Sequence, residues 1–229
     1  MLPFPLLPRL APSCEILCIG AHCDDIEIGC GGTLLTLQRA YPGTRIHWLV
    51  LTSNPKRRTE ALRSMRRFVR PAARGEVLIH DLPDGRLPGR VDAAKSLLEA
   101  CRERILPDLV FTHHADDRHQ DHAIVAHLTW QTFRDHAIWA YEIPKWDGDL
   151  ATPNAYVPLP ATLAERKARF IVATFDSQQS KSWFRNDNLL ALMRLRGLEC
   201  HAESGFAEAF HCRKLVFRPL TRPVREGRP

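Results

Sequence analysis

The sequence predicts an α/β protein in which a mostly parallel sheet is covered by helices on both faces. Short apolar runs that favour strands alternate along the chain with segments whose apolar residues recur at helical spacing. This alternation is typical of strand–helix–strand units, which build parallel sheets. The 229 residues are long enough for one domain with a substantial core. We expect that domain over residues 1–212 and a basic C-terminal tail over 213–229, which has no packing pattern beyond residue 218.

Each expected strand is an apolar run bounded by turn-forming or charged residues. The five strands are 14–20, 46–52, 76–80, 109–112 and 137–142. Each expected helix places its apolar residues on one face, and the helix over 91–105 is expected to stop before Pro107. The six helices are 31–39, 56–74, 91–105, 121–133, 163–172 and 188–196. The first of them is expected to open after a glycine-rich turn. The long irregular segment over 144–160 is the expected wall of an active site.

The composition is that of an ordinary globular protein, with 45% hydrophobic and 25% charged residues. No apolar run approaches the ~18 residues that span a bilayer. The first 13 residues are rich in proline and make a poor signal peptide. The seven cysteines form no CxxC pair, so we expect buried thiols and not disulfides. We therefore expect a cytoplasmic protein.

The net charge of +6 is concentrated in two places, the C-terminal tail and the helix over 56–74. That helix holds eight basic residues against the single acidic residue Glu60. Two interpretations stay open: a solvated helix face, or attraction for an anion such as a nucleotide sugar, a phospholipid or RNA. Nucleic acid is not expected, because stacking surfaces need interleaved aromatic residues and only Phe68 and Phe217 are present.

Two clusters of polar residues follow expected strands. The first is Ala21-His22-Cys23-Asp24-Asp25, directly after the apolar run that ends at Gly20. The second is His119-Gln120-Asp121-His122, which follows the strand over 109–112 after a short loop. In open α/β sheets, ligands bind at the carboxyl ends of the strands. If the two strands are neighbours, the two clusters meet at that edge.

These residue types suit a metal-dependent hydrolase. Catalytic zinc commonly takes three protein ligands and leaves a position for water, whose pKa falls to ~7. His22, Asp25 and His122 are the candidate ligands, and Asp24 is the candidate general base. His119 is the candidate oxyanion partner, with Asp121 orienting a histidine. The residues alone leave open which of the two adjacent aspartates binds metal.

Other interpretations of the first cluster are weaker. The carboxylates could simply cap a helix, and Gly29-Cys30-Gly31-Gly32 could suggest a phosphate loop. The glycines have neither the GxGxxG spacing nor the GK[ST] ending of nucleotide-binding loops. His113 and His114 are expected to be strand-end or loop residues and not ligands.

At these residues the chain resembles the PIG-L/LmbE-like family of zinc-dependent N-deacetylases. The family motif A-H-P-D-D-E, followed by G-C-G-G, matches Ala21–Asp25 and Gly29–Gly32, and its H-x-D-H motif matches His119–His122. Weaker likeness extends over roughly residues 14–212. It includes Leu82-Pro83-Asp84-Gly85, the Arg57/Glu60 pair, Tyr141-Glu142, Ser177-Gln178, Arg196-Gly197 and Ala207-Glu208-Ala209-Phe210.

The resemblance implies a Rossmann-like three-layer α/β/α fold and an amide substrate, typically an N-acetylated amino sugar or its conjugate. It makes His22, Asp25 and His122 the ligands of Zn²⁺ and Asp24 the general base. It makes His119 the oxyanion partner, oriented by Asp121. Fe²⁺ or Co²⁺ would also suit such ligands.

Two residues depart from the family motif. Cys23 replaces the usual proline, which adds a thiol beside the site, and Ile26 replaces the first acidic residue after the aspartate pair. Glu27 keeps the acidic residue that follows. Neither change removes a candidate ligand or the base, so we expect an active enzyme.

The expected activity is removal of an N-acetyl group from an N-acetylglucosamine-type amino sugar or glycoconjugate, with release of acetate. One alternative is hydrolysis of another acyl conjugate, such as a thiol-sugar amide, an acylated antibiotic or an ester. The other is a sugar- or nucleic-acid-binding protein without catalysis. Arg57 and Arg118 are the candidate substrate-binding residues. The oligomeric state, including a homo-oligomer, stays open.

Overall fold

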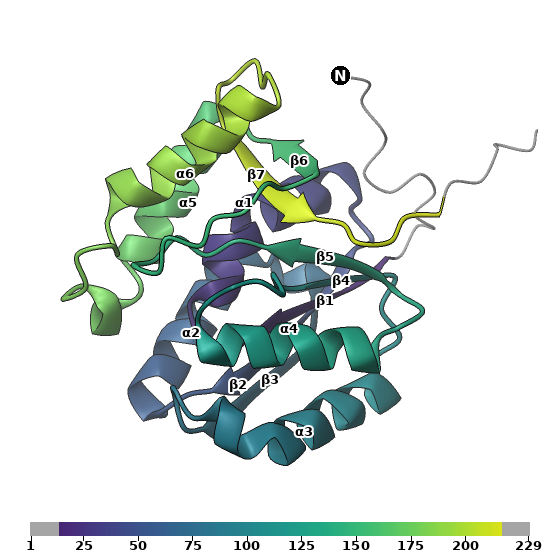
Figure 1. Cartoon of the computed structure of the whole chain (residues 1–229). Coiled ribbons are helices and arrows are strands. Elements are labelled where there is room, and N and C mark those ends of the chain that lie inside the picture. Colours follow the sequence, from purple (N-terminus) through teal and green to yellow (C-terminus); the bar gives the residue numbers. More distant parts are fainter. Residues whose placement is uncertain (1–13, 217–229) are drawn as a thin grey trace, which may run out of the picture.

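A single seven-stranded sheet forms the middle of three layers in the computed structural model, which describes residues 14–216 (Figure 1). The N-terminal segment and most of the predicted basic tail lie outside the described residues. The strand order is β3-β2-β1-β4-β5-β7-β6. The strands are β1 (Glu15–Gly20), β2 (Arg45–Thr52), β3 (Arg74–Leu82), β4 (Leu109–His113), β5 (Ala137–Tyr141), β6 (Ala155–Pro158) and β7 (Ala207–His211).

The strands from β1 to β5 pair in parallel, as the sequence predicts. Strand β1 pairs with β4 in the register Ile16↔Leu109 and Cys18↔Phe111. Their carboxyl ends therefore lie side by side at one edge of the sheet. This neighbour relation is the condition under which the two polar clusters meet.

Helices cover both faces of the sheet and enclose two apolar cores (Figure 1). Alternate residues of a strand point to opposite faces, and in β1 Ile16 and Cys18 enter one core while Leu17 and Ile19 enter the other. The helices are α1 (Asp25–Ala40), α2 (Pro55–Phe68), α3 (Val91–Arg104), α4 (Gln120–Thr132), α5 (Ala161–Val172) and α6 (Asn186–Glu199). Short 3₁₀ turns are η1 (Pro71–Ala73), η2 (Leu87–Arg90) and η3 (Asp176–Gln178). None of the helices within residues 14–216 has the length and apolar character needed to cross a bilayer.

The first helix begins at Asp25 and continues through the glycines, so the prediction of a glycine-rich turn before it is wrong. The glycines serve close packing instead. A Cβ added at Gly29 would lie 2.2 Å from the ring of the buried Tyr141, and one at Gly32 would lie 2.5 Å from Leu159. Because the helix begins six residues earlier than predicted, Asp25 lies in its first turn, close to the end of β1.

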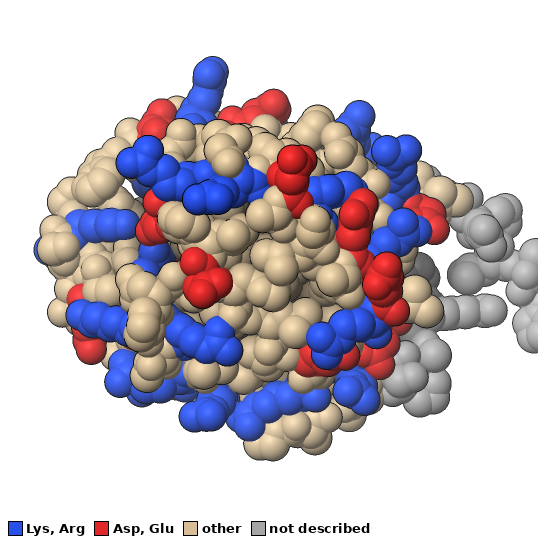
Figure 2. Space-filling view, turned by 90° about the horizontal axis from the view of Figure 1, so that it is seen from below, with Lys and Arg blue, Asp and Glu red and all other residues tan. Residues whose placement is uncertain are grey.

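The basic helix is shorter than predicted and most of its arginines bind the protein's own backbone. Helix α2 ends at Phe68, and Pro71 opens a separate 3₁₀ turn because its ring cannot continue the helix. Arg63 donates to the carbonyl oxygen of Thr174 at 3.0 Å, and Arg70 donates to that of Gln38. On the face drawn in Figure 2, basic side chains are spread widely and line the lower edge, while many of the acidic ones gather toward the right.

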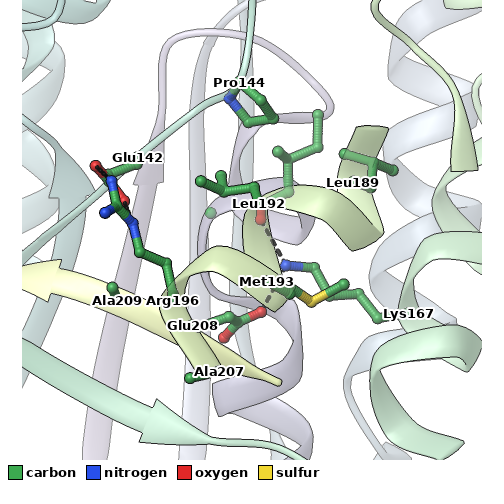
Figure 3. Close-up of a pocket in the computed structure, with 12 residues that line it drawn as sticks. Glu142, Pro144, Lys167, Leu189, Leu192, Met193, Arg196, Ala207, Glu208 and Ala209 are labelled. Carbon is green, nitrogen blue, oxygen red and sulfur yellow. Dashed lines mark hydrogen bonds and ion pairs between the residues drawn. The ribbon is translucent and has the colours of Figure 1, made fainter. Parts of the chain in front are cut away.

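Strands β6 and β7 complete the sheet, and the sequence analysis missed both. β7 runs antiparallel to β5 and to β6. Its Glu208 is buried and accepts the backbone N–H groups of Gly32 and Thr33 at 2.7 and 2.6 Å. Lys167 of α5 donates to Glu208 and to the carbonyl oxygen of Ile28, both at 2.6 Å (Figure 3). This buried pair therefore joins α1, α5 and β7.

The same pair lines a cavity of about 20 Å³ between α1, α5, α6 and β7 (Figure 3). A second buried pair, Arg196 with Glu142, closes its other side through contacts of 2.7 and 2.8 Å. All four charged groups have partners, and the cavity is too small for a sugar. We assign these ion pairs to the stability of the fold.

Replacing Lys167 with methionine is expected to lower the free energy of unfolding by about 3–5 kcal/mol, because it leaves the Glu208 carboxylate buried without a cation. Urea unfolding followed by circular dichroism measures the change. Lys56→Met removes an exposed lysine and serves as the control, with a midpoint close to that of the unchanged protein. Equal midpoints for the two variants would show that the buried pair contributes nothing.

Candidate metal centre

The two polar clusters meet at the carboxyl edge of β1 and β4. His22 lies two residues beyond the end of β1, and His122 lies in the first turn of α4. Although they are 100 residues apart in sequence, Nδ1 of His22 lies 3.1 Å from Nε2 of His122. The adjacency of the parallel strands explains this convergence, and it is the arrangement that the sequence predicts.

The three candidate ligands have a separation that suits a metal ion. Asp25 Oδ2 lies 3.3 Å from His22 Nδ1, and Asp25 Oδ1 lies 3.4 Å from His122 Nε2. In a tetrahedral zinc site with bonds of about 2.0–2.1 Å, ligand atoms lie roughly 3.3–3.4 Å apart. Two imidazoles and one carboxylate are also the donor types that catalytic zinc takes. The residues present therefore fit a bound divalent metal.

Further side chains that can bind a metal surround these three. Together they form three groups, and within each group the possible ligand atoms lie within 4.8 Å of one another. The groups are His22 with His119 and His122, Asp25 with His113 and His122, and His22 with Asp84 and Asp121.

The charges around His22 favour a cation. Burial opposes protonation of this side chain, but the carboxylates of Asp25, Asp121 and Asp84 outweigh it and raise the pKa of His22 well above its usual value. Burial likewise opposes ionisation of Asp25, yet the neighbouring histidines hold its pKa well below the usual range. A positive charge at this point of the structure is thus compensated by carboxylates already in place.

Asp117 contacts the ring of His122, a role that the sequence does not predict. Its Oδ2 lies 3.0 Å from Nδ1 of His122, so Nε2 of His122 is left for the metal. Hydrogen bonds of this kind fix the tautomer and ring direction of metal-binding histidines. Asp117 is buried whereas the side chain of the preceding Asp116 is 88% exposed. The sequence offers two adjacent aspartates in one loop and no periodic pattern that distinguishes them.

His113 lies against the ring of His122 and the carboxylate of Asp25. It is the last residue of β4, as predicted, and its ring stacks on that of His122 with centroids 3.9 Å apart. Nε2 of His113 lies 3.0 Å from Asp25 Oδ2 and 3.0 Å from the backbone nitrogen of Ala21, which donates to it. Burial, followed by the charge of His122, lowers the pKa of His113 to about 4. The ring of His113 is therefore uncharged at neutral pH and lines the site.

Asp24 lies at the N-cap position of α1 but does not cap the helix with its side chain. Its Oδ1 instead accepts a hydrogen bond from Nη2 of Arg57 at 2.8 Å. Nη1 of Arg57 donates to Asp84 at 2.6 Å. Arg57, a candidate substrate-binding residue, is buried and holds two carboxylates of the site. Its contacts fix the position of Asp24.

The carboxylate of Asp121 lies against the ring of His22 and not against that of His119. The Asp121 carboxylate accepts the backbone N–H groups of Gly85 and Leu87 at 2.7 and 3.1 Å, and its Oδ2 lies 3.3 Å from Nε2 of His22. The His119 side chain contacts Asp121 only through the backbone, since its Nδ1 accepts the Asp121 N–H at 3.3 Å. The resemblance implied the other pairing. The turn at the start of α4 directs the carboxylate toward the β3–α3 loop instead.

The remaining residues singled out from the sequence lie around the site. Arg118 is exposed, and its backbone N–H donates to Asp149 at 2.7 Å. Cys23 is buried, donates to the carbonyl oxygen of Thr52, and has its pKa raised to about 12 by burial, so it stays a thiol. Burial also raises the pKa of Glu27 well above the usual value. Burial therefore disfavours the charged form of both groups.

A family model described as GlcNAc-PI de-N-acetylase, PIG-L, matches residues 17–133, just over half of the chain. No curated protein matches the sequence. Among solved structures, the chain is similar to an N,N′-diacetylchitobiose deacetylase from Pyrococcus horikoshii, with 20% identity, a TM-score of 0.65, and 86% of this chain and 82% of that chain covered.

Two further structures show how widely this fold is used. The chain is 18% identical to an A40926 pseudoaglycone deacetylase, with a TM-score of 0.64 over 86% of this chain and 96% of that one. It is 16% identical to a 4-carboxy-2-hydroxymuconate hydratase from Pseudomonas putida, with a TM-score of 0.69 over 91% of this chain and 100% of that one. At these identities the likeness establishes the fold. Together with the match over residues 17–133, it shows that the chain belongs to the PIG-L family, with the LmbE-like α/β/α fold.

Proposed function

We propose that the protein is a metal-dependent hydrolase that removes the N-acetyl group from an N-acetylglucosamine-type amino sugar or glycoconjugate and releases acetate. The observation that carries the proposal is the convergence of His22, Asp25 and His122 within 3.1–3.4 Å of one another. Asp24 precedes Asp25 in the chain, and Arg57 joins its carboxylate to Asp84, which contacts His22. The family to which the chain belongs is described by a de-N-acetylase activity, which supports the same chemistry.

Zn²⁺ held by these three residues would lower the pKa of water to about 7 and polarise the amide carbonyl group. Fe²⁺ and Co²⁺ suit the same two imidazoles and one carboxylate. The proposal does not depend on which of these metals the protein takes in the cell.

We assign the proton transfers to Asp24. Arg57 donates to its Oδ1, which leaves Oδ2 to accept the proton of the attacking water and to return it to the leaving amine. Arg57 is itself fixed by Asp84, so the carboxylate of Asp24 has little freedom to turn away. The arginine therefore acts on catalysis by positioning the base.

His119 is suited to donate a hydrogen bond to the oxyanion. Its Nδ1 accepts the backbone N–H of Asp121, so the neutral ring carries its proton on Nε2. Burial, and then the charges of His122 and His22, lower the pKa of His119. A neutral donor is thus available at neutral pH beside His22, whose ring centroid lies 4.8 Å away.

Asp117→Asn is expected to weaken metal affinity about 10–100-fold, because the amide no longer fixes the tautomer of His122. Competition with a chelating dye measures the affinity. Asp116→Asn, at the adjacent exposed position, should leave it unchanged. An affinity that is equal in the two variants would remove Asp117 from the metal centre.

A panel of N-acetylated sugars tests the proposed function. Free, nucleotide-linked, lipid-linked and glycosidic N-acetylglucosamine are each assayed for acetate release, with added zinc and again with chelator. Release that chelator abolishes from at least one member is the expected result. Absence of release from every member, with metal demonstrably bound, would refute the deacetylase proposal for these substrates.

A second candidate keeps the same chemistry with another acyl conjugate. The similarity to the A40926 pseudoaglycone deacetylase favours an acylated antibiotic among the alternatives. Thiol-sugar conjugates are the other acyl conjugates to be tested. Matched amide and ester substrates of each class, assayed beside the sugar panel, separate this candidate from the first.

A further inference from the structure

Two tryptophans lie against each other on loops beside the metal centre. Trp146 follows β5 and is 68% exposed, and Trp183 precedes α6. Their rings meet edge to face with centroids 6.5 Å apart. The indole N–H of Trp146 donates to Oγ of Ser182 at 3.2 Å. An exposed indole is thus held in a defined orientation by a partner from another part of the chain.

The loop that carries Trp146 is tied to one side of the metal centre. The neighbouring Lys145 forms ion pairs with Asp117 at 3.0 Å and with Asp149 at 2.5 Å. Asp117 is the residue that orients His122. The Asp149 carboxylate also accepts the backbone N–H of Arg118. Lys145, the residue before Trp146, is therefore linked through Asp117 to the candidate metal ligand His122.

The segment that carries Trp183 is tied to the other side. Ser177 donates to Glu60 of α2 through both its backbone N–H, at 2.9 Å, and its hydroxyl group, at 2.6 Å. Glu60 lies one helical turn beyond Arg57, which holds Asp24. Figure 1 shows the segment between α5 and α6 on the side of the sheet toward which β5 points.

Lys181 places a cation beside the tryptophan pair. Its Nζ lies 5.8 Å from the centre of the Trp183 ring. The loop of Trp146 is therefore joined to Asp117, and the segment that carries Trp183 and Lys181 is joined to helix α2.

We propose that Trp146 and Trp183 form a stacking subsite for the sugar ring linked to the N-acetylated sugar whose amide is cleaved. This inference rests on the proposed function. A pyranose ring presents C–H groups on its face and hydroxyl groups at its rim. The indole faces, which carry partial negative charge, suit the C–H groups. Lys181, Ser182 and Arg118 provide polar groups nearby for the rim.

The surroundings favour a sugar over an acyl chain. A long acyl chain needs a continuous apolar groove to remove it from water. Here the aromatic pair is surrounded by Lys145, Lys181 and Ser182, and the contacts that fix it are polar. An amphipathic ring satisfies both the aromatic faces and the polar surroundings.

The test compares a disaccharide with a monosaccharide. In Trp146→Ala and Trp183→Ala, kcat/KM for N,N′-diacetylchitobiose is expected to fall about 10-fold, while kcat/KM for N-acetylglucosamine changes less than about 2-fold. Trp130→Phe is the control, because Trp130 lies on α4 against Arg213 and Lys214. Equal losses for the two sugars, or no loss for the disaccharide, would overturn the subsite.

A binding measurement separates failure of this inference from failure of the proposed function. Addition of N,N′-diacetylchitobiose is expected to change the tryptophan fluorescence of the metal-loaded protein, and that change should be lost in Trp146→Ala but kept in Trp130→Phe. This pattern without acetate release would support the sugar subsite and contradict the deacetylase activity. Acetate release with a fluorescence change that persists in Trp146→Ala would contradict the subsite alone.

Discussion

Replacing Asp24 with asparagine is expected to reduce kcat for acetate release about 10³-fold while the protein keeps its metal. The asparagine amide can still accept the hydrogen bond from Arg57 through its oxygen, so the local structure is preserved. It cannot accept a proton from water, and general acid–base catalysis typically contributes 10²–10⁴-fold. Steady-state assays on the best sugar of the panel measure the loss, and elemental analysis of the same samples measures bound metal.

The contrast between Asp24 and the exposed Asp116 makes this prediction specific. Asp116→Asn removes the same charge from a nearby loop and should retain nearly full activity. If Asp24→Asn turned over at a near-normal rate, Asp24 would not be the base. If Asp24→Asn lost both metal and activity, Asp24 would be a ligand, and the division of roles between Asp24 and Asp25 would be reversed.

Replacing His22 with alanine is expected to weaken metal binding by more than ~100-fold, beyond the effect typical of an outer residue such as Asp117. The substitution removes one of three candidate ligands. It also leaves the carboxylates of Asp25, Asp84 and Asp121 without the imidazole that lies 3.1–3.3 Å from each of them. Competition with a chelating dye gives the affinity, and the activity should fall in parallel unless zinc is supplied in large excess.

His127 provides the matched control for this variant. It is an exposed histidine on α4, and its ring contacts Gln131. His127→Ala should bind zinc as the unchanged protein does. Equal zinc affinity in His22→Ala and His127→Ala would exclude His22 from the ligand set.

The convergence of the two polar clusters could be predicted from the sequence because both are short segments that follow strands. His22, Asp24 and Asp25 need only the end of β1, and His119 and His122 need only the start of α4. The parallel pairing of β1 with β4 then brings them together. Both the alternation of strands with helices and the edge at which ligands bind follow from general rules of α/β folds.

The supporting residues could not be predicted, because their roles depend on contacts across the fold. Asp117 and Asp116 are equivalent in sequence, and only the packing of the loop buries Asp117 against His122. The sequence singles out Arg57 as a candidate substrate-binding residue, whereas its burial and its hydrogen bonds to Asp24 and Asp84 support the positioning role that we propose for it. The pairing of Asp121 with His22 depends on the conformation of the β3–α3 loop.

Strands β6 and β7 escaped prediction for a similar reason. β6 has four residues, and β7 carries the charged Glu208 as its second residue. A buried glutamate in a strand contradicts the apolar pattern until its partners, Lys167 and the backbone of α1, are seen. The sequence predicts a turn at Gly29–Gly32 because the side chains that require small residues there, such as Tyr141 and Leu159, lie far away in sequence.

Zinc titration of the metal-free protein tests the central claim most directly, namely that one metal held by His22, Asp25 and His122 supports amide hydrolysis. Acetate release from the best sugar of the panel is measured as zinc is added to protein stripped with chelator. We expect negligible release without metal and a rise that ends at one equivalent of zinc per chain. Full activity of the metal-free protein, or a rise that continues to two equivalents, would contradict this account.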